Sequence, residues 1–566
     1  MSVCIIHMDI KFVYITSHMG RLRFTLTNIM FWIVLMLSCF LAENYALFTD
    51  APRTGFNSFP LYFLTFAIIG LLVFYYITEH KKNGLTFDKI LLPAFIMIGA
   101  LLIWTVFRQG DRTFTNWAGD GTFNIAFTFG DRMLAALQVV VWLAVLYAIV
   151  FVYNRYRLNL ESYRWIPKVY IIIVLLLCLI DLFYEWDIIA GIFAGTYTGS
   201  GIEFIFGNQN VWALVLFSGM LTGLILSYKR FSWYYFSTMI AIFLYMIFTT
   251  SATSIYISLL VIALYPAYEI YKAIRKDKNR GLKILIVYVS IWTVVIGLVA
   301  LFINIGVPIF ANFWTFVDKS LLHKDFLTIT GRTEIWTHII DLLKQNPLDF
   351  IFGIGHQTGS KIFQTYNAGH MPVKSAHNGI MEVFLRYGLL GVIIYSGVLL
   401  LVFFCLVLHT RQKRYRFVII YGLAYLALLS HSVAESTNFF TPNVGGVYFG
   451  MFFLLPILNI LQNKKLKELK EETVKVSVKT ERVPQIFIIA TVLFVALSVA
   501  FIKVIHNFTN IDIFSCIVMF IVLMMSTLFV FILTNNATIN IINRNITADY
   551  IRRLEVVKKY EKWNWN

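Results

Sequence analysis

The sequence predicts an all-α protein that crosses a membrane many times. Of its 566 residues, 59% are hydrophobic and only 14% are charged, a balance far outside the range of soluble proteins. The apolar residues form long runs, and in lipid such a run is helical because only internal hydrogen bonds can satisfy its backbone. About fourteen runs approach the roughly 20 residues that a bilayer requires. We therefore expect a polytopic membrane protein with about 14 transmembrane helices and one large, helical extracytoplasmic loop.

The predicted spans are separated by polar segments that divide the chain into three regions. The spans cover approximately residues 24–42, 57–78, 89–107, 132–152, 168–186, 208–228, 234–250, 254–270, 282–305, 379–408, 417–434, 444–462, 485–504 and 511–533. Residues 306–378 are too polar for the membrane and form the large loop. We expect a transmembrane core at 1–462 that includes this loop, a charged cytoplasmic linker at 463–484, and an accessory hairpin with a cytoplasmic tail at 485–566.

The formal net charge of +17 is distributed unevenly along the chain. Alternate loops hold most of the basic residues, roughly 35 of the 47 Lys and Arg if the N-terminus lies inside. The positive-inside rule then places both termini in the cytoplasm and the large loop outside the cytoplasmic membrane. Orientation and contact with membrane lipids account for the basic excess, so we expect no nucleic-acid partner.

Cysteine and histidine spacing gives no indication of a disulfide framework or a metal site. The five cysteines are isolated, and four of them fall inside apolar runs. The histidines of the large loop match no common zinc spacing and have no cysteine among them. These are His323, His338, His356, His370 and His377. We expect neither a metal nor another cofactor.

The segment from residue 330 to residue 391 contains the motifs that point to chemistry. The string GRTEIW begins at Gly331 and opens an amphipathic helix, which the string NP ends at Asn346. The apolar positions at helical spacing are Ile335, Trp336, Ile339, Ile340, Leu342 and Leu343. Two glycines, Gly353 and Gly355, indicate a tight turn. Further on, the string HN at His377 precedes by nine residues the string GLLG, whose glycines would let helices approach closely.

These motifs resemble those of the O-antigen ligase and O-antigen polymerase family. Its members are membrane glycosyltransferases with an Arg-led GR-x-x-x-W helix, a turn containing NPL and GIG, and an HN-x9-GxxG signature where the loop returns to the membrane. The resemblance covers roughly the central third of the chain and implies a GT-C-like fold. It also implies metal-independent, inverting transfer of a glycan from an undecaprenyl-diphosphate carrier to a hydroxyl acceptor on the outer face. A chain-length regulator or a flippase would be a protein partner of such an enzyme.

The transfer requires a base for the acceptor hydroxyl and positive charge for the departing diphosphate. His377 is the expected base, because imidazole exchanges a proton near neutrality and the start of a helix favours its neutral form. Arg332 is the expected partner of the diphosphate, because a guanidinium stays charged and grips phosphate oxygens with two donors. The alternatives are a histidine that merely caps a helix and a surface arginine paired with Glu334 or Asp341.

Weaker candidates surround these two expected catalytic residues. Asn378 would cap the helix or orient substrate, and Glu382 would position the acceptor or pair with Arg386. The remaining predicted substrate contacts are Lys361, Lys374 and Asn210. Asn210 belongs to the string GNQNVWA, which fits imperfectly a Pro-Asn-x-x-Ala pattern of the family. Where the family frequently has Ser-Arg, this chain has Ser251-Ala252, so no second arginine is carried over.

The sequence leaves open which acceptor is used. The abundance of Ile, Lys, Phe and Tyr is typical of an AT-rich, Gram-positive genome, whose envelope contains no lipid A, and this favours a polysaccharide polymerase for a capsule or exopolysaccharide. A ligase-type transfer to a lipid or wall acceptor is the alternative. The rival from another class is a flippase for lipid-linked oligosaccharides, which would carry charged residues inside its spans and often repeat symmetry. This chain concentrates its polar residues in one outer loop instead.

Overall fold

The computed structural model describes residues 91–129, a few positions between 130 and 164, and residues 165–454 with gaps. The longest gaps in these ranges are 116–120, 205–207, 320–331, 366–374, 412–414 and 440–443. All described residues belong to one compact unit. The predicted spans 24–42, 57–78, 485–504 and 511–533 and the predicted linker 463–484 lie outside the described residues, as does most of the span predicted at 132–152.

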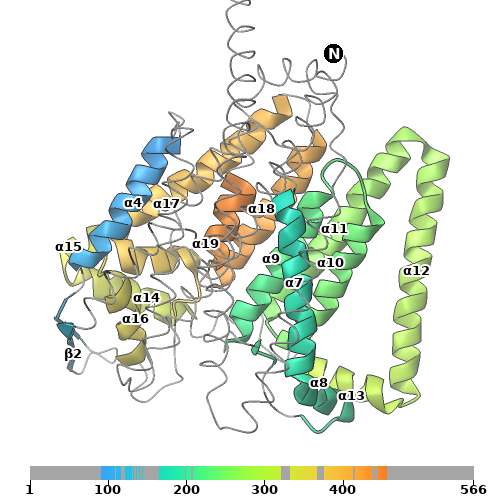
Figure 1. The fold of residues 1–566 in the computed structure, drawn as a ribbon, viewed down its shortest axis with the longest axis horizontal. Helices are drawn as coiled ribbons and strands as arrows, with labels where there is room; N and C mark the ends of the chain where they lie inside the picture. Colours follow the sequence, from blue (N-terminus) through green and yellow to red (C-terminus); the bar gives the residue numbers. More distant parts are fainter. Residues whose placement is uncertain are drawn as a thin grey trace, which may run out of the picture. The chain divides into compact units, whose positions relative to one another are not determined.

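The described chain is mostly helical, with one small hairpin (Figure 1). In chain order its elements are α4 (Leu91–Arg108), β1 (Arg112–Thr115), β2 (Thr122–Ile125), α7 (Trp165–Tyr184), α8 (Trp186–Ala194), α9 (Gln209–Leu226), α10 (Trp233–Met246), the 3₁₀ turn η4 (Ile247–Thr249), α11 (Ala252–Lys276), α12 (Lys278–Asn304), α13 (Pro308–Val317), α14 (Arg332–Lys344), α15 (Pro347–Phe352), α16 (His356–Thr365), α17 (Gly379–Arg411), α18 (Tyr415–Ala434), α19 (Val444–Phe449) and the π-helical turn η6 (Gly450–Leu454).

Five of the described helices are long and apolar enough to cross a membrane. They are α9, α11, α12, α17 and α18. Shorter apolar helical stretches lie at Ile96–Arg108, Tyr170–Tyr184, Trp233–Thr249 and Pro308–Val317. An isolated apolar helix of this length is stable in lipid, where its backbone needs no water. The prediction of a helical membrane protein is confirmed, whereas the number of about 14 spans and the GT-C-like arrangement remain predictions.

Two segments differ from the prediction. The spans expected at 254–270 and 282–305 continue toward each other, so that α11 ends at Lys276 and α12 begins at Lys278. Lys and Arg are good helix formers, and hydropathy marks the apolar length rather than the end of a helix. The connector after Arg108 contains an antiparallel hairpin, in which Arg112 pairs with Ile125 and Thr115 with Thr122. The all-α prediction therefore misses one small sheet.

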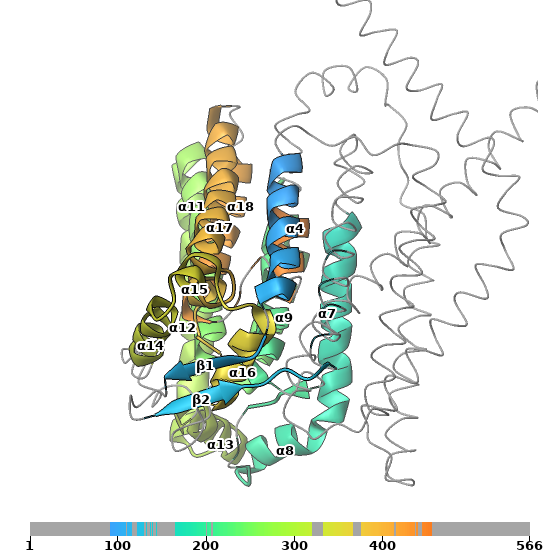
Figure 2. The same cartoon turned by 90° about the vertical axis from the view of Figure 1, so that its left-hand side faces the viewer.

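The large loop has its own hydrophobic core. Buried side chains of the hairpin, α14, α16 and the first turns of α17 form one cluster, and Figure 2 shows the hairpin beside α16. The members contributed by α14 are Ile335, Ile339, Leu342 and Leu343, with Trp336 and Ile340 at the edge. The predicted amphipathic helix is thus confirmed, and Asn346 ends it by accepting a hydrogen bond from the N–H of Leu348 at 3.0 Å, which caps α15.

Glycines attach the loop to α17. The N–H groups of Ile354 and Gly355 donate to the carbonyls of Leu385 and Arg386 at 3.0 and 3.1 Å, just before Gly388. Gly388 has φ +67°, a left-handed conformation that breaks α17, and a Cβ there would lie 2.4 Å from the backbone of Ile351. Gly388 therefore kinks α17 and also lets the short helix α15 approach it closely, as the sequence leads us to expect of a signature glycine.

At the ends of the spanning helices that lie away from the large loop, Arg416 joins three segments of the chain. The guanidinium of Arg416, at the start of α18, donates to the carbonyls of Tyr228 and Ser227, both at 3.0 Å, and pairs with Glu269 of α11. α14, α15 and α16 gather at the opposite end of the helices, beside the start of α17 (Figure 1). The loop and the basic connections thus occupy opposite ends of this unit.

Candidate functional site

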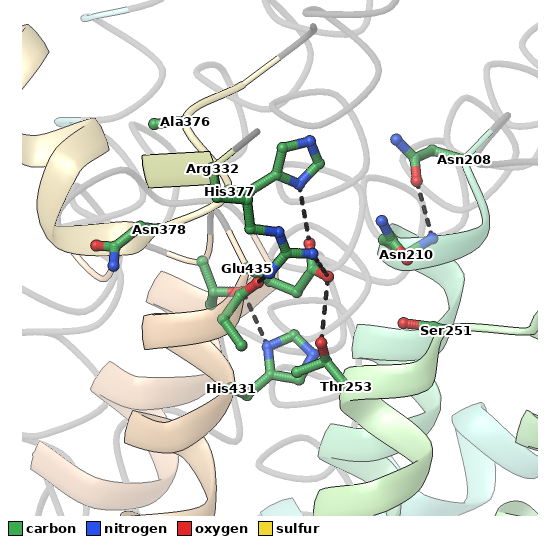
Figure 3. Close-up of polar contacts among 12 residues, drawn as sticks. Asn208, Asn210, Ser251, Thr253, Arg332, Ala376, His377, Asn378, His431 and Glu435 are labelled. Carbon is green, nitrogen blue, oxygen red and sulfur yellow. Dashed lines mark hydrogen bonds and ion pairs between the residues drawn. The ribbon is translucent and has the colours of Figure 1, made fainter. Parts of the chain in front are cut away.

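The two predicted catalytic side chains meet at one carboxylate. Nη2 of Arg332 lies 3.7 Å from Oε1 of Glu435, and Nδ1 of His377 lies 3.5 Å from Oε2 of the same group (Figure 3). Arg332 also donates through Nη1 to the carbonyl of Ala434. The Arg332 and His377 side chains are each 33% exposed, whereas Glu435 is 10% exposed. α14, the start of α17 and the end of α18 therefore place a cation, an imidazole and a carboxylate together.

Glu435 is held in its ionised form. Burial raises the pKa of this carboxyl, but the hydrogen bond and charge of His377, together with His431 and Arg332, hold the pKa below its ordinary value. Thr253 donates to Oε1 at 3.4 Å from the first turn of α11, where the helix dipole also favours negative charge. The sequence motifs gave Glu435 no role, and its one signal is an acidic residue directly after an apolar run.

His431 supports the end of α18 beneath Glu435. It is only 1% exposed, and its ring stacks on Phe217 with centroids 5.0 Å apart. Its Nε2 lies 2.9 Å from Oγ of Ser254, and its Nδ1 lies 3.2 Å from Oγ1 of Thr437. With both nitrogens bonded to hydroxyls, this histidine fixes α18 against α11 and leaves the solvent-facing chemistry to His377.

Asn378 caps α17 with its amide oxygen and contacts α18 with its amide nitrogen. Its Oδ1 accepts from the N–H groups of Ile380 and Met381 at 2.9 and 3.1 Å, and its Nδ2 donates to the carbonyl of Val433 at 3.0 Å. Of the two roles predicted for it, the structure shows capping. His377, just before the cap, has φ +48°, a left-handed conformation that few residues other than glycine adopt.

Glu382 is fully buried. Its Oε1 accepts from the N–H of Ala376 at 2.8 Å, and its Oε2 lies 2.8 Å from Nη2 of Arg386. Nη1 of Arg386 in turn lies 2.9 Å from Nδ1 of His356. Pairing with Arg386, the second role predicted for Glu382, is what the structure shows. The prediction that it contacts the acceptor is not supported, because its side chain has 0% exposure.

The remaining predicted substrate contacts are Asn210, Lys361 and Lys374. Asn210 lies in the first turn of α9, where its N–H donates to Oδ1 of Asn208 at 2.8 Å. In the view of Figure 3, both asparagines and Ser251 lie on the opposite side of Glu435 from Asn378. Lys361 lies on α16, and Lys374 falls outside the described residues.

The arrangement is suited to proton transfer beside an anion. In the described parts of the chain, no group of three or more His, Cys, Asp or Glu side chains is placed to hold a metal ion. A carboxylate on Nδ1 fixes the tautomer in which Nε2 of His377 accepts a proton, and the 3.5 Å separation leaves room to tighten when a substrate binds. Arg332 adds a half-exposed guanidinium, the group best shaped for phosphate.

Comparison with known proteins finds a family match for the region that contains Arg332 and His377. Residues 211–396 match the family model described as O-antigen ligase, a stretch that includes both Arg332 and His377 and ends before Glu435. No curated protein and no solved structure matches the chain. The resemblance of the loop motifs is confirmed: the central region of this membrane protein, residues 211–396, is similar to the O-antigen ligase family.

Proposed function

We propose that the protein is a metal-independent, inverting glycosyltransferase that moves a glycan from an undecaprenyl-diphosphate carrier to a hydroxyl acceptor. The family implies glycan transfer by a membrane enzyme. The single observation that carries the finer proposal is the convergence of Arg332 and His377 on Glu435, although α14 and α17 are separate elements.

Each of the three side chains has one task in the transfer. Glu435 orients His377 through Nδ1, and Nε2 takes the proton of the acceptor hydroxyl. The acceptor oxygen then bonds to the anomeric carbon from the face opposite the carrier, so the configuration inverts. The bond from the anomeric carbon to the phosphate oxygen breaks at the same time, and the departing diphosphate keeps the electron pair. Arg332 stabilises the charge that grows on it.

The distribution of charge supports a site on the outer face. The basic connections near Arg416 lie at one end of the spanning helices, and the large loop lies at the other. Because basic connections remain in the cytoplasm, the loop would face outward, and both termini would lie inside. A prenyl tail could then stay in the bilayer while its sugar reaches His377 in water.

The proposed acceptor is another carrier-linked repeat, which makes the protein a surface polysaccharide polymerase. This part of the proposal rests on the amino-acid composition, which is typical of an AT-rich, Gram-positive genome. The envelope of such an organism contains no lipid A that could serve as the acceptor. Ligase-type transfer to a lipid or wall component uses the same chemistry, and the identity of the product distinguishes the two.

The decisive experiment replaces His377 by asparagine. Asn tolerates the left-handed backbone at this position, so His377→Asn removes the base without adding strain. The purified protein in lipid vesicles is given lipid-linked glycans extracted from the membranes of its own organism, and product length is scored. We expect the turnover to fall by about 10² to 10⁴-fold, the usual contribution of a general base.

His338→Asn is the matched control, because His338 lies on α14 in the same loop and is partly buried. It should keep wild-type turnover. Wild-type turnover in a well-folded His377→Asn variant would reject His377 as the base. A wild-type protein that moves the lipid-linked glycan between leaflets without extending it would show a flippase instead.

A further inference from the structure

The peptide group before His377 is held from both sides. The indole N–H of Trp336 donates to the carbonyl of Ala376 at 2.8 Å, and the N–H of Ala376 donates to Oε1 of Glu382 at 2.8 Å. Ala376 is fully buried, as is Glu382. Two bonds of ordinary length therefore fix the plane of this one peptide, and they come from two different helices, α14 and α17.

A buried chain of side chains keeps the carboxylate of Glu382 in place. Nη2 of Arg386 forms an ion pair with Oε2 at 2.8 Å, and Nη1 lies 2.9 Å from Nδ1 of His356. Burial, with the charge of Arg386 beside it, holds the pKa of His356 well below its ordinary value. A neutral His356 can accept the hydrogen bond from the guanidinium, so the chain runs without a clash of donors.

The backbone at His377 requires such support. Its φ of +48° is a sparsely populated conformation for histidine, and surrounding structure must impose it. Asn378 fixes the following residues through its cap on α17. Clamping Ala376 fixes the preceding side, so that the backbone of His377 is held on both sides while its imidazole lies beside Glu435.

The same clamp links the two predicted catalytic groups. Trp336 lies one helical turn after Arg332 on α14, so one helix carries both the guanidinium and the bond to the residue before His377. This accounts physically for an arginine and a tryptophan at a spacing of four in the GRTEIW string.

We propose that Trp336 and Glu382 are positioning residues that clamp the Ala376 peptide, and that through this clamp they set the imidazole of His377 against Glu435 and in register with Arg332. Neither side chain touches the substrate. The inference rests on the proposed function, because it assigns a task to residues around His377.

Trp336→Phe tests the clamp with the smallest change, because it removes the N–H and keeps an aromatic ring in the loop core. In the vesicle assay with extracted lipid-linked glycans, kcat should fall roughly 10- to 100-fold, since a base displaced by about 1 Å loses that much. KM should change less than threefold, because no substrate contact is removed. Trp314→Phe is the matched control on the 45% exposed Trp314 of α13, and it should leave kcat unchanged.

The double variant with His377→Asn decides whether Trp336 acts through the imidazole. Once the base is absent, Trp336→Phe should lower the remaining turnover less than twofold, because residues that work as a unit do not add. An equal loss in both backgrounds would overturn the inference, and so would a Trp336→Phe protein with wild-type kcat. If Trp336→Phe folds poorly, the folded fraction of each variant is measured by thermal unfolding, and turnover per folded molecule is compared in the two backgrounds.

The two levels of the argument fail separately. If His377→Asn keeps wild-type turnover, the proposed function is wrong whatever Trp336 does. If His377→Asn is inactive and Trp336→Phe is normal, only the clamp is wrong.

Discussion

Two arginine–carboxylate pairs of the same loop region are built differently. Arg386 and Glu382 lie 2.8 Å apart, one turn from each other on α17, with side chains 14% and 0% exposed. Arg332 and Glu435 come from α14 and the end of α18 and lie 3.7 Å apart, with side chains 33% and 10% exposed. In the first pair the charged atoms lie close together and both side chains are buried in the fold. In the second pair the charged atoms lie farther apart, and the arginine is partly open to solvent.

The difference indicates which guanidinium can serve a substrate. A buried pair that loses one partner leaves an uncompensated charge, so the arrangement is costly to disturb. A longer, half-exposed pair has little net energy, and its arginine can turn part of its donor fork toward a phosphate. Residue type alone does not separate Arg332 from Arg386, but distance and burial do.

Breaking the buried pair should have the largest effect. Glu382→Ala leaves Arg386 without its carboxylate and Ala376 without an acceptor, and we expect it to lower the free energy of unfolding by about 3 to 5 kcal/mol. Thermal unfolding of the purified protein in detergent measures this as a lower midpoint. A midpoint equal to that of the wild type would show that the pair does not stabilise the fold.

Removing the exposed arginine should affect activity and spare stability. Arg332→Ala should lower turnover about 10² to 10³-fold, as expected for a group aimed at transition-state charge. Its free energy of unfolding should change by about 1 kcal/mol or less, because the lost pair is partly exposed. Arg332→Lys should recover part of the turnover, since a point charge replaces the planar fork. A large loss of stability together with normal turnover per folded molecule would show that Arg332 stabilises the fold and does not serve the reaction.

The sequence predicted the parts of the site that local patterns encode. Apolar spacing located α14, the string NP located its end, and the motif resemblance singled out Arg332 and His377. These succeed because helix period, capping and turns depend on residues close in the chain.

Contacts between distant segments were not predictable from one sequence. Glu435 enters the site only because α18 ends beside α14 and the start of α17. The residues next to Glu435 in the sequence do not indicate which segments it will contact. The sequence leaves two partners open for Glu382, the acceptor and Arg386. Its complete burial follows from packing of α17 against α16 and the loop core, which a residue pattern does not contain.

The cap on α17 provides an intermediate case between the two pairs. Asn378→Ala removes an acceptor for two backbone N–H groups and a donor to Val433, and we expect a loss of about 1 kcal/mol in the free energy of unfolding. Asn378→Asp keeps the acceptor and should recover most of that loss. If Asp and Ala are equally destabilising, the bond to Val433 rather than the cap is what matters.

The smallest expected effect is the dependence of stability on pH at the looser pair. The pKa of Glu435 in the folded protein lies below its ordinary value of 4.5, mainly because His377, His431 and Arg332 outweigh its burial. A carboxyl with a depressed pKa stabilises the fold above the ordinary value, and this contribution disappears as the pH falls through the lower folded value. Glu435→Gln carries no such charge, so its unfolding midpoint should fall less than that of the wild type between about pH 6 and about pH 3.5. Parallel curves for the two proteins would mean that His377, His431 and Arg332 do not lower the pKa of Glu435 on folding.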